Sequence, residues 1–360
     1  MSSATGERRG PGERLRALDA GRALAVVAMV FGHTCDALLS PAARATPLAL
    51  AYWQARGLTA PLFMIISGWA VTLSMCRARA RGTEVVGARL ARLGLLLAFG
   101  YLLRLPGWDV QALLSGDLPI WEHLLAFDAL HVIAVGLLGA VVVLSLVRGR
   151  VAQGLTFLLL AALAVAMGLR SLSPLPTTLP ALAFSQALGG TSTFPTFPWV
   201  AYFFLGATIP LIAGDVRVRV AAGLAAVLVY LAASAWWSGF AHMPPAHPVL
   251  VSFRTGAVLL ALAACEVIPA RVAARLSPLA RSSLGVYVIH VPLVYGWYSL
   301  EGLAQRVGPR LPFHQTALVA LAVLAFSFAA ERALKRAGAG ATAAARAWRA
   351  RFALRADALG

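Results

Sequence analysis

Apolar residues fill most of the chain in long runs, and polar residues gather in the short stretches between them. Most of these runs have about the 20 residues that a helix needs to cross a bilayer. Of the 360 residues, 60% are hydrophobic and only 12% are charged, whereas a soluble domain is about 25% charged. The pattern predicts an all-α, polytopic transmembrane helix bundle with about ten spans. The runs occupy residues 18–39, 58–76, 86–104, 123–146, 151–169, 199–213, 217–237, 249–267, 283–300 and 315–333.

The positions of the arginines predict how the spans are oriented. The formal net charge is +17, but the basic residues are spread over short loops and form no single patch, so no nucleic acid is expected as a partner. Placing the N-terminus inside puts most basic residues in inner segments, while the outer loop near 107–122 carries Asp109, Asp117 and Glu122. The positive-inside rule predicts a multi-pass protein of the cell membrane with both termini cytoplasmic. The inner residues include Arg8, Arg9, Arg14, Arg16, Arg77, Arg79, Arg81, Arg89, Arg92, Arg148, Arg150, Arg217, Arg219, Arg271, Arg275 and Arg281.

Three segments follow from this pattern: a basic cytoplasmic N-terminal segment (1–17), a transmembrane domain (18–333) and a basic cytoplasmic tail (334–360). The tail carries Trp348 and Phe352 among arginines. It fits an amphipathic helix on the inner leaflet or a disordered end after the break at 338–340. The outer segment 170–198, rich in Pro, Ser and Thr, fits a lid, an acceptor-binding loop or a solvated connection.

A cleaved signal peptide is a rival interpretation of the first run, because residues 43–45 have the A-x-A form of a cleavage site. Such a peptide has no use for His33 and Asp36, so we expect the first helix in the mature protein.

The three cysteines show neither a CxxC spacing nor an even disulfide framework, and no HExxH or GxSxG motif is found. No metal is predicted.

The first run contains an arginine and a histidine on one helical face. Arg22 and His33 are eleven residues apart, which is close to three turns and roughly 16 Å along the axis. Asp19 and Asp36 fall near the same stripe. Ionisable groups at membrane depth are costly and are usually kept for function. We therefore expect this stripe to face a polar cavity, with Arg22 near the inner end and His33 near the outer end.

The chemistry of these side chains suits a transfer reaction. Arginine bonds phosphate oxygens in pairs and stays charged, and histidine titrates near neutrality and suits proton abstraction. Asp36, one turn beyond His33, could hold the imidazole tautomer. Two structural alternatives stay open: Arg22 as a snorkelling topology anchor, and His33 as a packed core residue.

Five stretches resemble the motifs of integral-membrane acyltransferases. Residues 18–33 look like the first-helix pattern of the acyltransferase-3 family and of the related heparan-alpha-glucosaminide N-acetyltransferase catalytic domain. Residues 60–69 resemble a second-helix "PLFxxxSG" motif, and 284–292 a late-helix motif shared by both families. Residues 127–134 and 197–206 look more like the heparan-type branch.

The resemblance implies transfer of an acyl group, commonly acetyl from acetyl-CoA, to an amine or hydroxyl, often of a sugar. On the matching positions, Arg22 would serve the CoA or the structure around it, and His33 would be the catalytic histidine. We expect CoA at the cytoplasmic mouth and a sugar, lipid or small-molecule acceptor entering from outside. His33 would act as general base or as acyl carrier.

Other polar groups are expected around the same cavity. Asp128 and His131 are predicted to be neighbours on one face of the fourth helix, because they are three residues apart. Arg254 needs Asp128, Asp36 or a bound anion, since an unpaired arginine at membrane depth is costly. Arg254, Tyr287 or a backbone N–H could stabilise the oxyanion. His131 and His290 fit substrate contacts or interhelical hydrogen bonds.

A different class of function also fits the intramembrane charges. A transporter or flippase of a lipid or sugar would use Arg, Asp and His groups as a proton or substrate path. The chain shows neither an internal duplication nor paired broken helices, which disfavours that class. Dependence on acyl-CoA would distinguish an acyltransferase from a transporter or flippase.

Overall fold

The computed structural model describes residues 16–83, 85–105, 111, 114–116, 118–170 and 178–357, and its regular structure in these ranges is helical. Eight helices in the described ranges are long and apolar enough to cross a membrane, and α11 (Thr196–Ile212) and α15 (Ser283–Tyr295) are two shorter apolar helices. All ten predicted runs therefore contain a helix, which confirms a polytopic bundle. The eight are α1 (Arg16–Leu38), α4 (Thr59–Ala80), α5 (Val86–Leu103), α8 (Ala129–Leu146), α9 (Arg150–Gly168), α12 (Val216–Trp236), α13 (Pro248–Glu266) and α17 (Phe313–Asp357).

Shorter helices connect the long ones. They are α2 (Pro41–Arg44), α3 (Pro47–Arg56), α7 (Leu118–Leu125), α10 (Leu179–Leu188), the 3-10 turn η1 (Phe240–His242), α14 (Ala270–Arg281) and α16 (Leu303–Arg306). The described part of the predicted outer segment 170–198 thus contains α10, which packs on α7 and α11, so this part is not simply a solvated connection. Residues 171–177 lie outside the described residues, as do Asp109 and Asp117.

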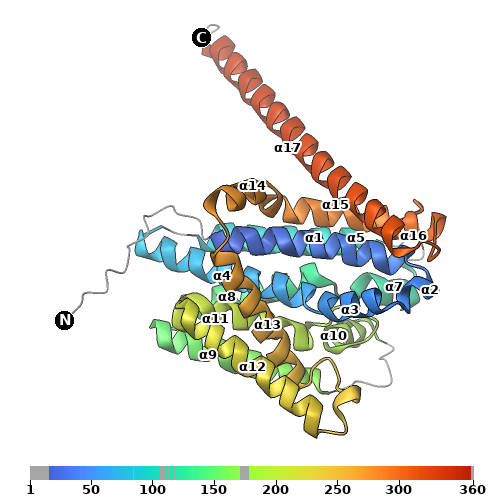
Figure 1. The fold of residues 1–360 in the computed structure, drawn as a ribbon. Helices are drawn as coiled ribbons and strands as arrows, with labels where there is room; N and C mark the ends of the chain where they lie inside the picture. Colours follow the sequence, from blue (N-terminus) through green and yellow to red (C-terminus); the bar gives the residue numbers. More distant parts are fainter. Residues whose placement is uncertain are drawn as a thin grey trace.

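Three predicted spans have different bounds in the structure. The run 123–146 is divided, because Asp128 caps a new helix by accepting the N–H groups of Leu130 (2.8 Å) and His131 (3.3 Å). The run 283–300 ends at Tyr295, where Gly296 takes a φ of 82°. The last helix continues to Asp357 through the expected break at 338–340 and leaves the bundle (Figure 1). The side chains of Trp348 and Phe352 lie outside the described ones.

The helix α11 forms the centre of one half of the bundle, packed against α4, α8 and α9. A Cβ added to Gly68 would lie 1.9 Å from the backbone oxygen of Phe203, and one added to Gly206 would lie 2.1 Å from that of Ile65. Only glycine permits so close a crossing of α4 and α11, as is usual for small residues between membrane helices.

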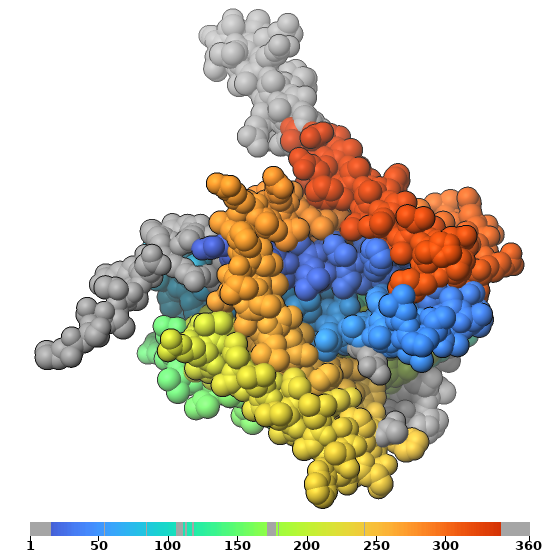
Figure 2. Space-filling model, viewed as in Figure 1, coloured from blue at the N-terminus to red at the C-terminus, as the bar shows by residue number. Residues whose placement is uncertain are grey.

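The helix α1 is the most enclosed of the eight, because α4, α13, α14, α15 and α17 pack around it. On the face shown in Figure 2, only a strip of α1 is visible between α13, α14 and α17. The polar side chains of α1 are thereby held inside the protein and away from lipid.

Candidate functional site

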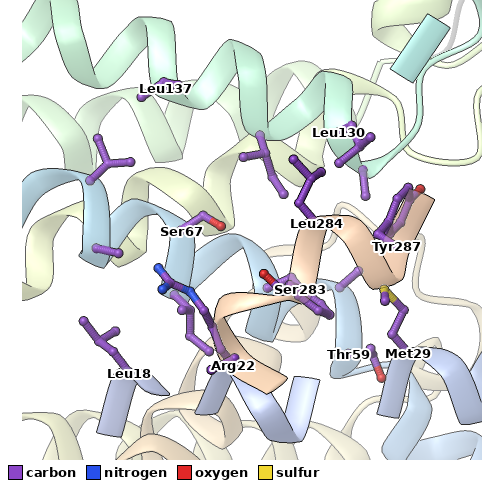
Figure 3. A pocket seen from close by; sticks show the side chains of 18 of the residues that line it. Leu18, Arg22, Met29, Thr59, Ser67, Leu130, Leu137, Ser283, Leu284 and Tyr287 are labelled. Carbon is purple, nitrogen blue, oxygen red and sulfur yellow. The ribbon is translucent and has the colours of Figure 1, made fainter. Parts of the chain in front are cut away.

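A cavity of about 1150 Å³ runs through the bundle beside α1. Both Arg22 and His33 line it, together with residues of α4, α5, α8, α13 and α15. Figure 3 shows Arg22 from α1, Ser67 from α4, and Ser283 and Tyr287 from α15 around this space. The two residues eleven positions apart on α1 therefore belong to one cavity, as the helical stripe predicts.

One end of the cavity is strongly basic, and we call it the basic end. Among the lining residues that the structure describes there, Asp19 is the single carboxylate, and it accepts a hydrogen bond from Ser277 Oγ (3.0 Å). The first turn of α15, whose N–H groups lack intrahelical acceptors, starts at Ser283 on the same wall. This end is suited to a polyanion. Its arginines are Arg22, Arg77, Arg81, Arg89, Arg92 and Arg281.

At the other end of the cavity His33 is joined to a second histidine. Its Nδ1 lies 2.9 Å from Nε2 of His290, and the two rings stack with their centroids 5.0 Å apart. Nδ1 of His290 lies 2.8 Å from the carbonyl oxygen of Val286. Because a carbonyl can only accept, His290 Nδ1 carries the hydrogen, and in a neutral ring its Nε2 is then the acceptor.

This arrangement assigns the tautomer of His33. With His290 Nε2 as acceptor, His33 Nδ1–H is the donor, so neutral His33 presents an unprotonated Nε2. A histidine with its outer nitrogen free of hydrogen is suited to act as a general base. The orientation of the His33 imidazole is thus held by its contact with His290.

Asp36 contacts an arginine rather than His33. Its two carboxylate oxygens accept from Arg56 Nη1 (3.0 Å) and Nη2 (2.9 Å), and Oδ2 also accepts from the Tyr295 hydroxyl (3.3 Å). The Tyr295 hydroxyl also lies 3.4 Å from the backbone oxygen of His33, with its ring edge on the imidazole. The expected Asp36–His33 contact is therefore replaced by His33–His290, because α15 supplies a nearer partner.

Sequence reasoning did not identify Arg56 as a site residue. The structure brings it from α3 to the cavity wall, with Trp53 beneath its guanidinium at 5.3 Å. Gly32 permits this approach, since a Cβ there would lie 3.3 Å from Arg56 Nε. The signal in the sequence was Asp36 itself, because a carboxylate at the end of the first apolar run needs a cation nearby.

Asp128 and His131 are neighbours, but as a helix cap. His131 Nδ1 lies 2.9 Å from Asp128 Oδ1, and the fully buried His131 ring packs between Phe127 and Tyr101 outside the cavity. The prediction that both residues lie on one face of a helix is therefore wrong for Asp128, which precedes the first turn of α8. Tyr287 lines the cavity and donates to Asp128 Oδ2 (3.4 Å).

Arg254 also lines the cavity, and its guanidinium carbon lies 5.8 Å from the ring centre of Trp199. Neither predicted carboxylate pairs with Arg254. Asp128 caps α8 and bonds to His131 and Tyr287, and Asp36 bonds to Arg56.

Within the described residues, no three His, Cys, Asp or Glu side chains form a group that could hold a metal.

Comparison with protein families gives a match that covers most of the chain. Residues 15–332 match a family model described as an acyltransferase domain. The matched range includes every helix that lines the cavity, from α1 to α15. No curated protein matches the sequence.

Proposed function

The chain belongs to the acyltransferase-3 family, and from that premise we propose that this membrane acyltransferase takes an acyl group, acetyl in the simplest case, from cytoplasmic acyl-CoA. The acceptor is an amine or hydroxyl of a sugar or another envelope molecule. The observation that supports this most is the single cavity that joins the cluster of arginines to His33. We also propose a relationship to the related heparan-type acetyltransferases, because residues 127–134 and 197–206 look more like the motifs of that family.

The basic end suits the nucleotide of CoA, which carries several phosphate charges. Six arginines and the first turn of α15 surround one carboxylate there, and guanidinium groups bond phosphate oxygens in pairs. The cavity volume of about 1150 Å³ exceeds the roughly 300–1,000 Å³ of ordinary ligand pockets. It accommodates a ligand that reaches from the basic end to His33, with the thioester at the imidazole. On the basis of the positive-inside rule, the basic end and both termini are proposed to face the cytoplasm.

His33 Nε2 would take the proton from the acceptor as its nitrogen or oxygen attacks the thioester carbonyl. The carbon–sulfur bond then breaks, and the CoA thiolate takes the proton from the imidazolium, which balances the reaction. His290 would stabilise the transient positive charge through the Nδ1–H bond of His33. Attack by His33 Nε2 itself would instead form an acyl-histidine, and that route would give ping-pong kinetics.

Thermal unfolding of the detergent-purified protein tests the donor site. Acetyl-CoA at a hundred times its Kd should stabilise wild type by about 2.7 kcal/mol. We expect Arg22→Ala to lose this stabilisation and His33→Gln to keep it while losing release of thiol from acetyl-CoA. Acetyl-pantetheine, which lacks the nucleotide, is the matched ligand control. Folded wild-type protein that responds to no acyl-CoA would refute the donor and favour a transporter, and full activity in His33→Gln would refute the base.

A further inference from the structure

Arg254 is a cation inside the bundle that has no acidic partner among the residues the structure describes. No acidic residue in the described ranges forms a salt bridge with it, and its Nη1 is buried without a hydrogen-bond partner there. Its contact with the face of Trp199 offsets part of the cost of desolvation. A guanidinium at membrane depth that lacks a carboxylate is strongly destabilised unless water or an anion reaches it.

The carboxylates that could neutralise Arg254 have other partners. Asp36 binds Arg56 with both oxygens, and Asp128 accepts from the cap of α8 and from Tyr287. Glu266, on the same helix as Arg254, pairs with Arg219 near the opposite end of α13. The neutral hydroxyl of Tyr202 also lies beside Arg254, so within the described residues no negative charge compensates the Arg254 guanidinium.

Arg254 reaches the same cavity as His33, but from a different helix. It lies six residues after the start of α13 at Pro248, and His33 lies five residues before the end of α1 at Leu38. The two helices pack against each other, and both side chains line the same cavity. An anion at Arg254 would therefore share the cavity with the proposed base, and it would be bound by an arginine that is not one of the six that form the basic end.

We infer that Arg254 and Trp199 form a subsite for an anionic group of the acceptor, a carboxylate or a phosphate. The inference rests on the proposed function, since it gives the acceptor a chemical class. A guanidinium binds either group through two parallel hydrogen bonds. A charge that exists only in the transition state would not compensate a permanent cation, so the ligand is an anion in the ground state.

The test is thermal unfolding with small probes while excess CoA occupies the basic end. Benzoate and phenyl phosphate are the anionic probes, and benzyl alcohol is the neutral control of the same shape. We expect a saturable rise in Tm of wild type with at least one anionic probe and none with benzyl alcohol. Arg254→Gln should lose the rise, Arg254→Lys should retain part of it, and Arg217→Gln, an exposed arginine on α12, should retain all of it. Which anion acts distinguishes carboxylate from phosphate acceptors.

An equal response in wild type and Arg254→Gln would overturn the inference, as would a wild-type protein that responds to neither anionic probe. The wild-type comparison of charged and neutral probes holds even if Arg254→Gln fails to fold. The rise in Tm caused by CoA alone, recorded on the same samples, reports the donor site separately. Loss of that rise points to failure of the proposed function, and loss of the probe response alone points to failure of the acceptor subsite.

Discussion

Replacing His290 by phenylalanine tests whether His33 acts through the tautomer assigned above. The change keeps an aromatic ring against His33 but removes the Nε2 acceptor at 2.9 Å, so the His33 Nδ1–H is left buried and unpaired. An unsatisfied buried donor costs about 1–3 kcal/mol, which corresponds to roughly a 5- to 150-fold loss of rate if the cost falls on the reacting geometry. His33→Phe should lose more, because general-base catalysis contributes about 10²- to 10⁴-fold.

The assay is release of free thiol from acetyl-CoA with one amine or hydroxyl acceptor, at saturating donor. Because His290 is expected to act only through His33, the double variant His33→Phe/His290→Phe should be no slower than His33→Phe alone. His314→Phe, an exposed histidine on α17, is the matched control and should keep the wild-type rate. The proposal that His290 acts through His33 would be refuted if the double variant were slower than His33→Phe by the same factor that His290→Phe alone loses. Wild-type activity in folded His290→Phe would also refute it.

Two further predictions concern stability. Gly68→Ala should lower the free energy of unfolding by about 1–3 kcal/mol, because its Cβ would lie 1.9 Å from a backbone oxygen of α11. Gly94→Ala, with no atom within 4 Å of the added Cβ, should not lower Tm, and equal Tm values for the two variants would contradict the crossing of α4 and α11. Glu266→Ala should lower the free energy of unfolding by about 3 kcal/mol, because it leaves Arg219, which is 2% exposed, with backbone carbonyls as partners but no negative charge. Glu301→Ala, from an exposed pair, should change stability by less than about 1 kcal/mol, and a loss as small in Glu266→Ala would argue against the buried pair.

The helical bundle and the stripe on α1 could be predicted because both depend on local periodicity. A long apolar run must form a helix in a bilayer, where each backbone N–H and C=O needs a partner within the segment. The spacing of Arg22 and His33 then places them on one face, and both line the cavity. The divided span at Asp128 also has a local cause, a helix-capping carboxylate, which the apolar pattern alone does not reveal.

Residue type and span depth were equally informative about which side chains need partners. Arg254 and Asp36 are costly at membrane depth, so a compensating group could be expected for each before any contact was known. The identity of the compensating group could not be read from the sequence. In the structure, Arg56 is the partner of Asp36, and Arg254 packs on the face of Trp199.

The sequence by itself therefore determined the class of the protein, the bundle of apolar helices and the polar face of α1, because each follows from a period or a run within one segment. Only the tertiary structure decided the partners: His290 for His33, 257 residues away, and α3 with Arg56 over the end of α1. Such pairings depend on how each helix is rotated and which helices adjoin it. Those choices come from side-chain packing and from close crossings, such as that of α4 at Gly68 against α11, which no local pattern encodes.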